Sequence, residues 1–461
     1  MSLIKSISGI RGTIGGVQGE NLTPMDIVAF TSGFAALVSS RHKSPKIIVG
    51  RDGRISGPMV QSLVTATLQS LGIHVLDAGL TTTPSLEMAI PAEKAHGGIM
   101  ITASHNPMEW NALKFMDEHG EFISAASGQQ LLELSSSAIR YNSGDRLGAY
   151  SQLKNTIANH IKAILKLRLV NIELIKNRKF KVVVDVINST GSLAVPALLD
   201  KLGCTYVVLN GDINGKFAHN PEPLPEHIGE LSAAVVKHKA DLGIVVDPDV
   251  DRLAFVCDNG DPFGEEYTLV SIADYVISKE IGNSVSNLSS TQALRDITLL
   301  NGGQYFASAV GEVNVVAKMK ETKAVIGGEG NGGVIYPKLH YGRDALAGIA
   351  LFLSQLAEFN KPISLLRAKY PNYEISKNKI ELTEKNEMDQ IFKRLKDQYH
   401  KHKTNIEDGL RIDLDGEWVH LRQSNTEPII RIYAESNSKV VADHLAQKLI
   451  KDIREIQKDL K

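Results

Sequence analysis

The stretch Ile244-Val-Val-Asp-Pro-Asp-Val-Asp-Arg252 decides the fold, because it takes a short apolar strand directly into a polar loop. The same transition occurs at Ile99-Met-Ile101, followed by Thr102-Ala-Ser-His-Asn-Pro107, and at Ala324-Val-Ile326, followed by Gly327-Gly-Glu-Gly-Asn-Gly-Gly333. In open α/β sheets, ligands gather at the carboxyl ends of strands. The three transitions therefore predict three α/β domains with their loops around one central cleft. Ordinary surface loops are the alternative.

The segments between these loops alternate strand-like and helical patterns. Thr23-Pro24 predicts a helix start, because Thr suits the N-cap and Pro the first helical position. Apolar residues then recur at helical spacing at Ile27, Phe30, Phe34, Leu37 and Val38. Lys46–Val49 and Lys181–Asp185 have the composition of buried strands. Strands that alternate with helices indicate α/β layers.

The last part of the chain has a different pattern. Arg411–Leu414, Asp415-Gly416 and Glu417–Leu421 form a hairpin signal, and Ile429–Glu435 predicts another strand. An amphipathic helix is expected from Val441 to Ile456. The fourth domain is therefore predicted to be α+β. The predicted domains are 1–150, 151–257, 258–369 and 370–461.

Composition excludes several classes of protein. A length of 461 residues suggests about three domains, with three or four both plausible, at roughly 150 residues each. The chain is 43% apolar and 22% charged, which excludes a disordered, collagen-like or membrane protein. A net charge of -1 argues against a nucleic-acid partner. Two unpaired cysteines and the lack of an apolar leader or span predict a cytoplasmic protein. The oligomeric state is not predicted.

Asp247, Asp249 and Asp251 are the most informative chemical feature. Side chains spaced by two share one face of an extended segment, so three carboxylates would repel one another there. A divalent cation such as Mg²⁺ relieves that repulsion, and the neighbouring Arg252 can hold a phosphate or a hydroxyl. An EF-hand is not supported, because Arg252 and Asp258 stand where it needs Gly and Glu. An aspartyl-phosphate enzyme remains open as an alternative.

Three further loops carry polar side chains. Ser104 follows a strand and is a candidate nucleophile, and Lys114 is a candidate acid/base or phosphate contact. Gly328–Gly333 matches a dinucleotide-binding spacing, but no helical pattern follows it, so Glu329 and Asn331 are predicted to bind sugar hydroxyls. The fourth loop predicts a phosphate site with a guanidinium and neutral donors from Arg422, Ser424, Asn425 and Thr426.

Together, in this order, the four loops resemble the α-D-phosphohexomutase family, which includes phosphoglucomutase/phosphomannomutase and phosphoglucosamine mutase. Thr102–Pro107 resembles the family's phosphoserine loop and Asp247–Arg252 its metal loop. Gly328–Gly332 stands at its sugar loop, and Arg422–Pro428 is similar to its phosphate loop. The opening Ser8-Gly-Ile-Arg-Gly12 is also similar. The resemblance covers essentially the whole chain and implies three related α/β domains followed by a fourth.

The resemblance implies roles for these residues. Ser104 would be phosphorylated, and it would bind Mg²⁺ together with Asp247, Asp249 and Asp251. Arg11 would be an active-site arginine, and His105 and Lys114 would be candidates for proton transfer. The implied reaction moves a phosphoryl group between C6 and C1 of a hexose phosphate through a 1,6-bisphosphate. A phosphoserine carries about -1.5 to -2 charge, so a metal and nearby cations are needed to hold it beside three carboxylates.

The expected substrate is glucosamine 6-phosphate, which would be converted into glucosamine 1-phosphate. Phosphoglucomutase/phosphomannomutase activity is the alternative. An aspartyl-phosphate hydrolase or mutase and a non-catalytic phosphosugar-binding protein are alternatives of other classes. The sugar loop departs from the family pattern, because Asn331 replaces a Ser and Gly333 stands where a His is usual.

Overall fold

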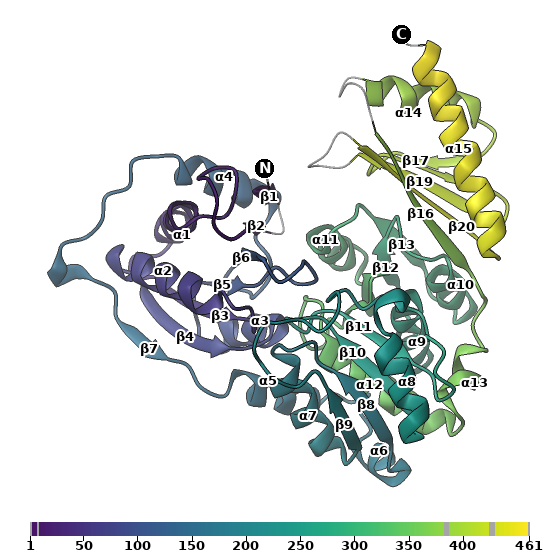
Figure 1. Cartoon of the computed structure of the whole chain (residues 1–461), viewed down its shortest axis with the longest axis horizontal. Helices are drawn as coiled ribbons and strands as arrows, with labels where there is room; N and C mark the ends of the chain where they lie inside the picture. Colours follow the sequence, from purple (N-terminus) through teal and green to yellow (C-terminus); the bar gives the residue numbers. More distant parts are fainter. Residues whose placement is uncertain (1, 7–8, 382–386, 424–428, 460–461) are drawn as a thin grey trace.

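The computed structural model describes residues 2–6, 9–381, 387–423 and 429–459. These residues form four sheets, which follow one another around the molecule in chain order (Figure 1). We call each sheet with its helices a unit and number the units from the N-terminus.

The first unit has a seven-stranded sheet in the order β1-β2-β6-β5-β3-β4-β7. Its strands are β1 (Ile4–Ser6), β2 (Gly9–Thr13), β3 (Lys46–Arg51), β4 (His74–Leu80), β5 (Gly97–Ile101), β6 (Trp110–Met116) and β7 (Tyr150–Gln152). Its helices are α1 (Pro24–Ser39), α2 (Gly57–Ser70), α3 (Thr83–Ala92) and α4 (Ala125–Ser135). Helix α1 begins as the sequence predicts, with a capping box between Thr23 and Asp26 and with Pro24 in its first turn.

The second and third units have four-stranded sheets. The second contains α5 (Thr156–Ile164), α6 (Ile172–Arg178), β8 (Lys181–Asp185), α7 (Gly191–Leu202), β9 (Thr205–Leu209), α8 (Gly229–His238), β10 (Leu242–Val246) and β11 (Leu253–Val256). The third contains α9 (Glu265–Lys279), β12 (Ser284–Asn287), α10 (Ala293–Leu300), β13 (Tyr305–Ser308), α11 (Glu312–Thr322), β14 (Ile326–Glu329), β15 (Gly333–Ile335), α12 (Ala345–Phe359) and α13 (Ile363–Arg367).

The same four-strand arrangement occurs in all three of these sheets. One central strand (β3, β8 or β12) lies between two parallel neighbours. The second of these neighbours (β5, β10 or β14) then turns back into an antiparallel strand (β6, β11 or β15). The three loops singled out by sequence are therefore the same hairpin connection in three copies.

The third hairpin begins later than the sequence predicts. We expected a strand over Ala324–Ile326 and a loop from Gly327, but β14 runs from Ile326 to Glu329. Its glycines permit close packing, since a Cβ on Gly327 would collide with the sulfur of Met319 on α11. Glu329 is therefore the last residue of a strand.

The fourth unit is an antiparallel sheet in the order β16-β20-β19-β18-β17 with two helices (Figure 1). Its elements are β16 (Glu374–Glu381), α14 (Glu387–Gln398), β17 (Lys403–Asn405), β18 (Leu410–Asp413), β19 (Trp418–Gln423), β20 (Ile429–Ser436) and α15 (Lys439–Asp459). This order completes the predicted fold class of three related α/β units and a C-terminal α+β unit.

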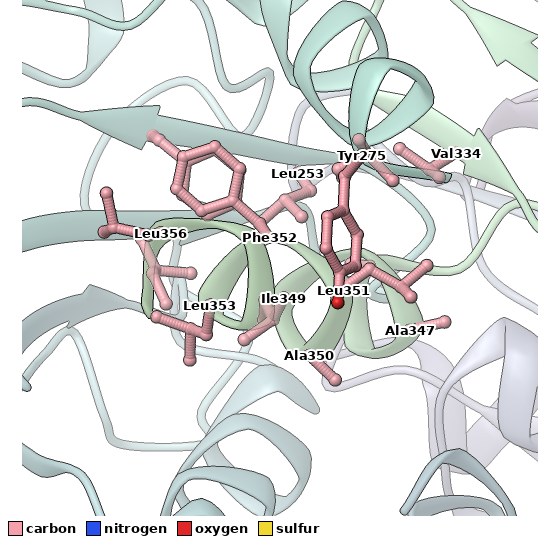
Figure 2. Close-up of a cluster of buried hydrophobic side chains, with 14 of the residues drawn as sticks. Leu253, Tyr275, Val334, Ala347, Ile349, Ala350, Leu351, Phe352, Leu353 and Leu356 are labelled. Atoms are coloured by element: carbon pink, nitrogen blue, oxygen red, sulfur yellow. The ribbon is translucent and has the colours of Figure 1, made fainter. Parts of the chain in front are cut away.

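Helix α12 lies at the centre of the largest hydrophobic core, which joins the second and third units (Figure 2). Its Phe352 stacks on Phe255 of β11 with ring centroids 3.8 Å apart and meets Phe263 edge-on. Because one apolar helix serves both units, their sheets are held in a fixed relation. No helix in the described part of the chain has the length and apolar character needed to cross a membrane.

Candidate active site

The three hairpin loops meet at one place. Ser104, after β5, donates a hydrogen bond of 2.6 Å from its Oγ to Oδ2 of Asp247, after β10. Arg343, just before α12, joins the second loop to the third: its guanidinium lies 2.8 Å from Asp251 Oδ2 and 3.1 Å from Glu329 Oε2. Segments far apart in the sequence thus form one contiguous site.

The loop that carries Ser104 has a constrained backbone. Ser104 has a φ of 48°, in the left-handed region that residues other than glycine rarely adopt. Its N–H donates to Thr102 Oγ1 at 3.0 Å, and the Thr102 hydroxyl donates to Asp52 Oδ2 at 2.7 Å. These contacts hold the Ser104 hydroxyl toward the second unit.

Arg54 fixes the same loop from within the protein. Its buried guanidinium pairs with Asp52 at 3.1 Å. It also donates to four backbone carbonyl oxygens at 2.6 to 2.9 Å, those of Ser104, Asn106, Pro107 and Trp110. A planar guanidinium with several donors suits such a set of acceptors.

Asp247, Asp249 and Asp251 form a fully buried acidic cluster. One oxygen of each lies within 4.8 Å of the other two. Among the residues that the structure describes, Asp249 Oδ1 and Asp251 Oδ1 have no hydrogen-bond partner. Burial, and then the charges of Asp251 and Asp249, raise the pKa of Asp247 well above its usual value. Buried carboxylates with free oxygens fit an oxygen-preferring cation such as Mg²⁺.

The three carboxylates converge through a turn and not through the extended segment that the sequence suggested. Val250 has a φ of 63°, which is rare for a β-branched residue, and its N–H donates to the Asp247 carbonyl at 3.1 Å. The N–H groups of Asp251 and Arg252 both donate to Asp247 Oδ1, at 3.0 and 3.1 Å. Strain of this kind is common at functional sites.

Two buried cations balance part of this negative charge. Lys114 Nζ donates to Asp249 Oδ2 at 2.8 Å and to Asp251 Oδ2 at 3.2 Å. Burial would lower the pKa of Lys114, but these two carboxylates outweigh it and raise the pKa. Arg343 also pairs with Glu312 at 2.9 Å. The acidic neighbours of Arg343 likewise overcome burial and raise its pKa.

Three further basic side chains, Arg252, His105 and Arg11, lie at the border of the site. Arg252 Nη1 lies 2.8 Å from Glu222 Oε1, and His105 Nε2 lies 4.0 Å from the same oxygen. Arg11 Nη1 donates to the Asn106 side chain at 3.5 Å. Burial, followed by the positive charges of Arg252 and Arg11, lowers the pKa of His105 well below 6.5. The Nε atoms of both arginines are buried and have no hydrogen-bond partner within the described ranges.

Comparison with known proteins supports one family along the whole chain. Models of phosphoglucomutase/phosphomannomutase match in order: α/β/α domain I at 4–141, domain II at 158–260, domain III at 264–373 and the C-terminal domain at 379–452. The chain belongs to this family. The domain boundaries predicted from sequence stay a prediction.

Similar proteins differ in the sugar that their names specify. A phosphoglucomutase/phosphomannomutase of Thermococcus kodakarensis is 34% identical, with 97% of this chain and 99% of that protein covered. A phosphoglucosamine/phosphogalactosamine mutase of Sulfurisphaera tokodaii is 32% identical, with 98% and 99% covered. These relatives confirm the predicted phosphohexomutase family and its isomerase class.

Solved structures show the same fold. A phosphoglucomutase/phosphomannomutase family protein of Burkholderia thailandensis has a TM-score of 0.84 at 25% identity, with 98% of each chain covered. An Aspergillus fumigatus N-acetylphosphoglucosamine mutase, solved with GlcNAc-6P and magnesium, has a TM-score of 0.60 at 14% identity, with 99% of this chain and 96% of that chain covered.

In this phosphohexomutase, the structure explains why Gly333 of the third loop stands where the family usually has a histidine. A Cβ on Gly333 would collide with the Arg343 side chain, so the arginine occupies the space that a larger residue would need. Glu329 Oε1 accepts from Asn287 at 2.9 Å and from the Gly311 N–H at 3.1 Å. Asn331 Oδ1 accepts the Gly333 N–H at 3.2 Å.

The phosphate loop expected in this phosphohexomutase is only partly described. Arg422 lies in β19, where its Nε is 2.7 Å from Asp408 Oδ2. Ser424, Asn425 and Thr426 lie outside the described residues. The role of this loop therefore stays a prediction, as do the roles of the other candidate site residues.

Sequence reasoning missed several residues of the phosphohexomutase site. Thr83 in the first turn of α3 donates from Oγ1 to Asp249 Oδ2 at 2.5 Å. The others, described above, are Arg54, Glu222, Glu312 and Arg343. A helix-start signal could have drawn attention to two of these positions, because Thr83-Pro84 begins α3 and Arg343 precedes the N-cap Asp344 of α12.

Proposed function

We propose that this phosphohexomutase moves a phosphoryl group between C6 and C1 of a hexose phosphate through a phosphoserine at Ser104. A hexose 1,6-bisphosphate would be the intermediate and the primer. The observation that carries the proposal is the 2.6 Å contact between Ser104 Oγ and Asp247 Oδ2. It sets a hydroxyl nucleophile beside an acidic cluster and within a ring of cations.

The residues that would hold Mg²⁺ are Ser104, Asp247, Asp249 and Asp251. The free buried oxygens Asp249 Oδ1 and Asp251 Oδ1 support this set, because hydrogen bonds within the described protein leave them unused. When bound, the cation would neutralise charge on the phosphoryl group during transfer. Lys114 would act as a fixed positive charge, since both carboxylates already hold its Nζ.

Other side chains would bind and orient the sugar phosphate. His105 Nδ1 has no hydrogen-bond partner in the described part of the chain, which suits it to accept a proton from the attacking hydroxyl. Arg11 and Arg252 would bind phosphate oxygens. Glu329 and Asn331 would contact ring hydroxyls, and Arg422 with Ser424, Asn425 and Thr426 would bind the phosphate that does not react. Positioning and charge supply most of the catalysis in phosphoryl transfer.

Glucosamine 6-phosphate is the substrate that we propose, with glucosamine 1-phosphate as the product. The name of the S. tokodaii relative supports this choice. Phosphoglucomutase/phosphomannomutase activity is the second candidate, which the T. kodakarensis relative favours. A cytoplasmic location and a partner set limited to small sugar phosphates also stay predictions.

A substrate panel tests the proposal. Turnover of glucosamine 6-phosphate, glucose 1-phosphate and mannose 1-phosphate would be compared with and without Mg²⁺, in the presence of a bisphosphate primer. We expect Mg²⁺-dependent turnover with glucosamine 6-phosphate preferred. A clear preference for mannose 1-phosphate would overturn the choice of substrate. Tight sugar-phosphate binding without turnover of any of the three would indicate a non-catalytic binding protein.

The site of phosphorylation separates this mechanism from an aspartyl-phosphate enzyme. Intact-mass measurement and peptide mapping after incubation with a hexose 1,6-bisphosphate would locate the phosphate. Acid-stable phosphate on Ser104 supports the proposal. A hydroxylamine-labile adduct on Asp247 would support the other class of enzyme.

A further inference from the structure

A second group of ligand-type side chains lies where three units meet, outside the site that holds Ser104. It consists of His160 on α5, His340 in the segment before α12, and Asp344 at the N-cap of α12. His160 and Asp344 are each 1% exposed, and the His340 side chain is 11% exposed. The proposed reaction uses none of these residues.

The three side chains converge on a common point. Asp344 Oδ2 lies 2.9 Å from His160 Nε2 and 3.2 Å from His340 Nε2, and one ligand atom of each residue lies within 4.8 Å of the others. The two imidazole rings are nearly perpendicular, with an interplanar angle of 87°. Ligand atoms around a tetrahedral zinc with bonds of 2.0–2.1 Å are about 3.3 Å apart. Two of the three ligand-atom separations, 2.9 and 3.2 Å, are therefore close to those around a tetrahedral zinc, and the third lies within 4.8 Å.

Each of the three side chains has its other polar atom in contact with a partner. His160 Nδ1 is 3.0 Å from Ser85 Oγ, and His340 Nδ1 is 3.3 Å from Glu87 Oε2. Asp344 Oδ1 accepts the N–H groups at the start of α12, from Leu346 at 2.9 Å and Ala347 at 3.1 Å. Histidines that bind metals usually have such an outer partner, often a carboxylate.

Glu87 is a second carboxylate beside this cluster, in contact with His340. It is 1% exposed, and neither of its oxygens has a hydrogen-bond partner within the described ranges. A Cβ on Gly342 would collide with its carboxylate, so the chain passes directly over it. A divalent cation would replace the protons that now join the two histidines to Asp344 and Glu87.

We propose that His160, His340 and Asp344 bind a divalent transition metal of the zinc class, with Glu87 and Ser85 as the outer partners of the two histidines. A mixed set of imidazole and carboxylate ligands suits zinc and its neighbours, whereas Mg²⁺ prefers oxygen ligands alone. The ligands come from the second and third units, and the outer partners lie on α3 of the first. The metal would therefore fix these three units against one another.

The location explains why such a site would matter for the reaction. Thr83, two residues before Ser85, contacts Asp249, and Arg343, next to Asp344, contacts Asp251 and Glu329. Helix α3 and the start of α12 thus each contact both clusters. A metal between them would hold the second and third hairpin loops in register without contacting the substrate.

The experiment uses the full chain without an affinity tag. The protein would be stripped with a chelator, incubated with zinc in excess Mg²⁺, and passed through gel filtration before the metal is measured by mass spectrometry. We expect the wild type and Asp249→Asn each to retain about one equivalent of zinc. His160→Gln and His340→Gln should each retain less than about a tenth of that amount. His42→Gln is the matched control, since it removes a histidine from another histidine pair and should retain full zinc.

Cobalt substitution keeps the test decisive if a variant fails to fold, which circular dichroism would show. Titration of the stripped wild type with Co²⁺ should give the strong visible bands of a four-coordinate site, with saturation at about one equivalent. The proposal would be overturned if the wild type retained no more zinc than a folded His160→Gln variant. A Co²⁺ spectrum without these bands would also overturn it. If Asp249→Asn lost as much zinc as the two histidine variants, the proposal would also be overturned, because the metal would then lie at the aspartate cluster.

Discussion

The aspartate cluster is fully buried and the histidine cluster nearly so, but they are built in different ways. Asp247, Asp249 and Asp251 come from one hairpin loop and offer only oxygen. His160 and Asp344 are 184 positions apart and combine nitrogen with oxygen. The first cluster touches the Ser104 hydroxyl at 2.6 Å, whereas the second touches helix ends and outer partners. The difference teaches that, under the two proposals, the donor type and a neighbouring hydroxyl distinguish a site for chemistry from a site for structure.

Replacement of Ser104 should have the largest effect. Ser104→Ala removes the hydroxyl that would carry the phosphate, so primed turnover should fall by roughly 10⁴-fold or more. Zinc retention at the histidine cluster should stay at the wild-type level. A coupled assay with a bisphosphate primer measures the first result and metal analysis the second. Turnover close to wild type would show that the 2.6 Å contact with Asp247 is not the reacting centre.

Replacement of Asp249 should have the next largest effect. Asp249→Asn removes one charged ligand, so Mg²⁺ affinity should fall by at least roughly 10- to 100-fold, with a matching loss of turnover at low Mg²⁺. Mg²⁺ titration of the rate measures the change. Asp415→Asn is the matched control, because Asp415 is exposed in the turn between β18 and β19. An unchanged Mg²⁺ dependence would contradict the role given to the aspartate cluster.

Replacement of Arg343 tests the connection between the aspartate cluster and the histidine cluster. Arg343→Met leaves Asp251, Glu312 and Glu329 without their shared cation, which should cost about 3–5 kcal/mol of unfolding free energy in urea. Arg343→Lys keeps the charge but not the planar fork, so its loss should be smaller. If Arg343 positions the third loop, Arg343→Lys should raise the KM for the sugar phosphate while Mg²⁺ dependence stays normal. Equal KM values in wild type and Arg343→Lys would restrict its role to stability.

Replacement of Glu87 should have the smallest effect on turnover. Glu87→Gln keeps the shape but removes the carboxylate beside His340, so zinc affinity should fall by roughly 10-fold while the rate in Mg²⁺ stays at the wild-type level. Competition with a chelating dye measures the affinity. A loss of turnover as large as that of Asp249→Asn would contradict the separation of the two clusters.

Much of the fold follows from local patterns. Apolar strands that end in polar loops predict the repeated hairpins, because a continuous apolar run indicates a buried strand and the polar residues mark where it ends. The cap at Thr23 and the hairpin around Asp415-Gly416 also follow from local chemistry. The start of the third hairpin does not follow from local chemistry, since Gly327 of β14 is explained by Met319 of α11 and Gly328 by the close approach of Gly333 in β15.

The residues of the candidate site also fall into those that local sequence patterns predict and those that they do not. Ser104 and the aspartates are visible because they lie together in short loops after strands. Arg343 is harder to find, since it is 92 positions from Asp251 and only the helix start that follows it marks its neighbourhood. The histidine cluster is hidden for the same reason. Side chains that meet only through tertiary packing leave no spacing pattern in the sequence.

Arg54 has a consequence for the way the substrate must behave. Its guanidinium occupies four carbonyl oxygens of the serine loop and the strand after it, so that backbone cannot change shape without breaking several buried hydrogen bonds at once. If Ser104 carries the phosphoryl group as proposed, the bisphosphate has to present first one end and then the other to its hydroxyl. With the backbone of the serine loop held in place, the sugar itself would then have to turn end over end between the two half-reactions.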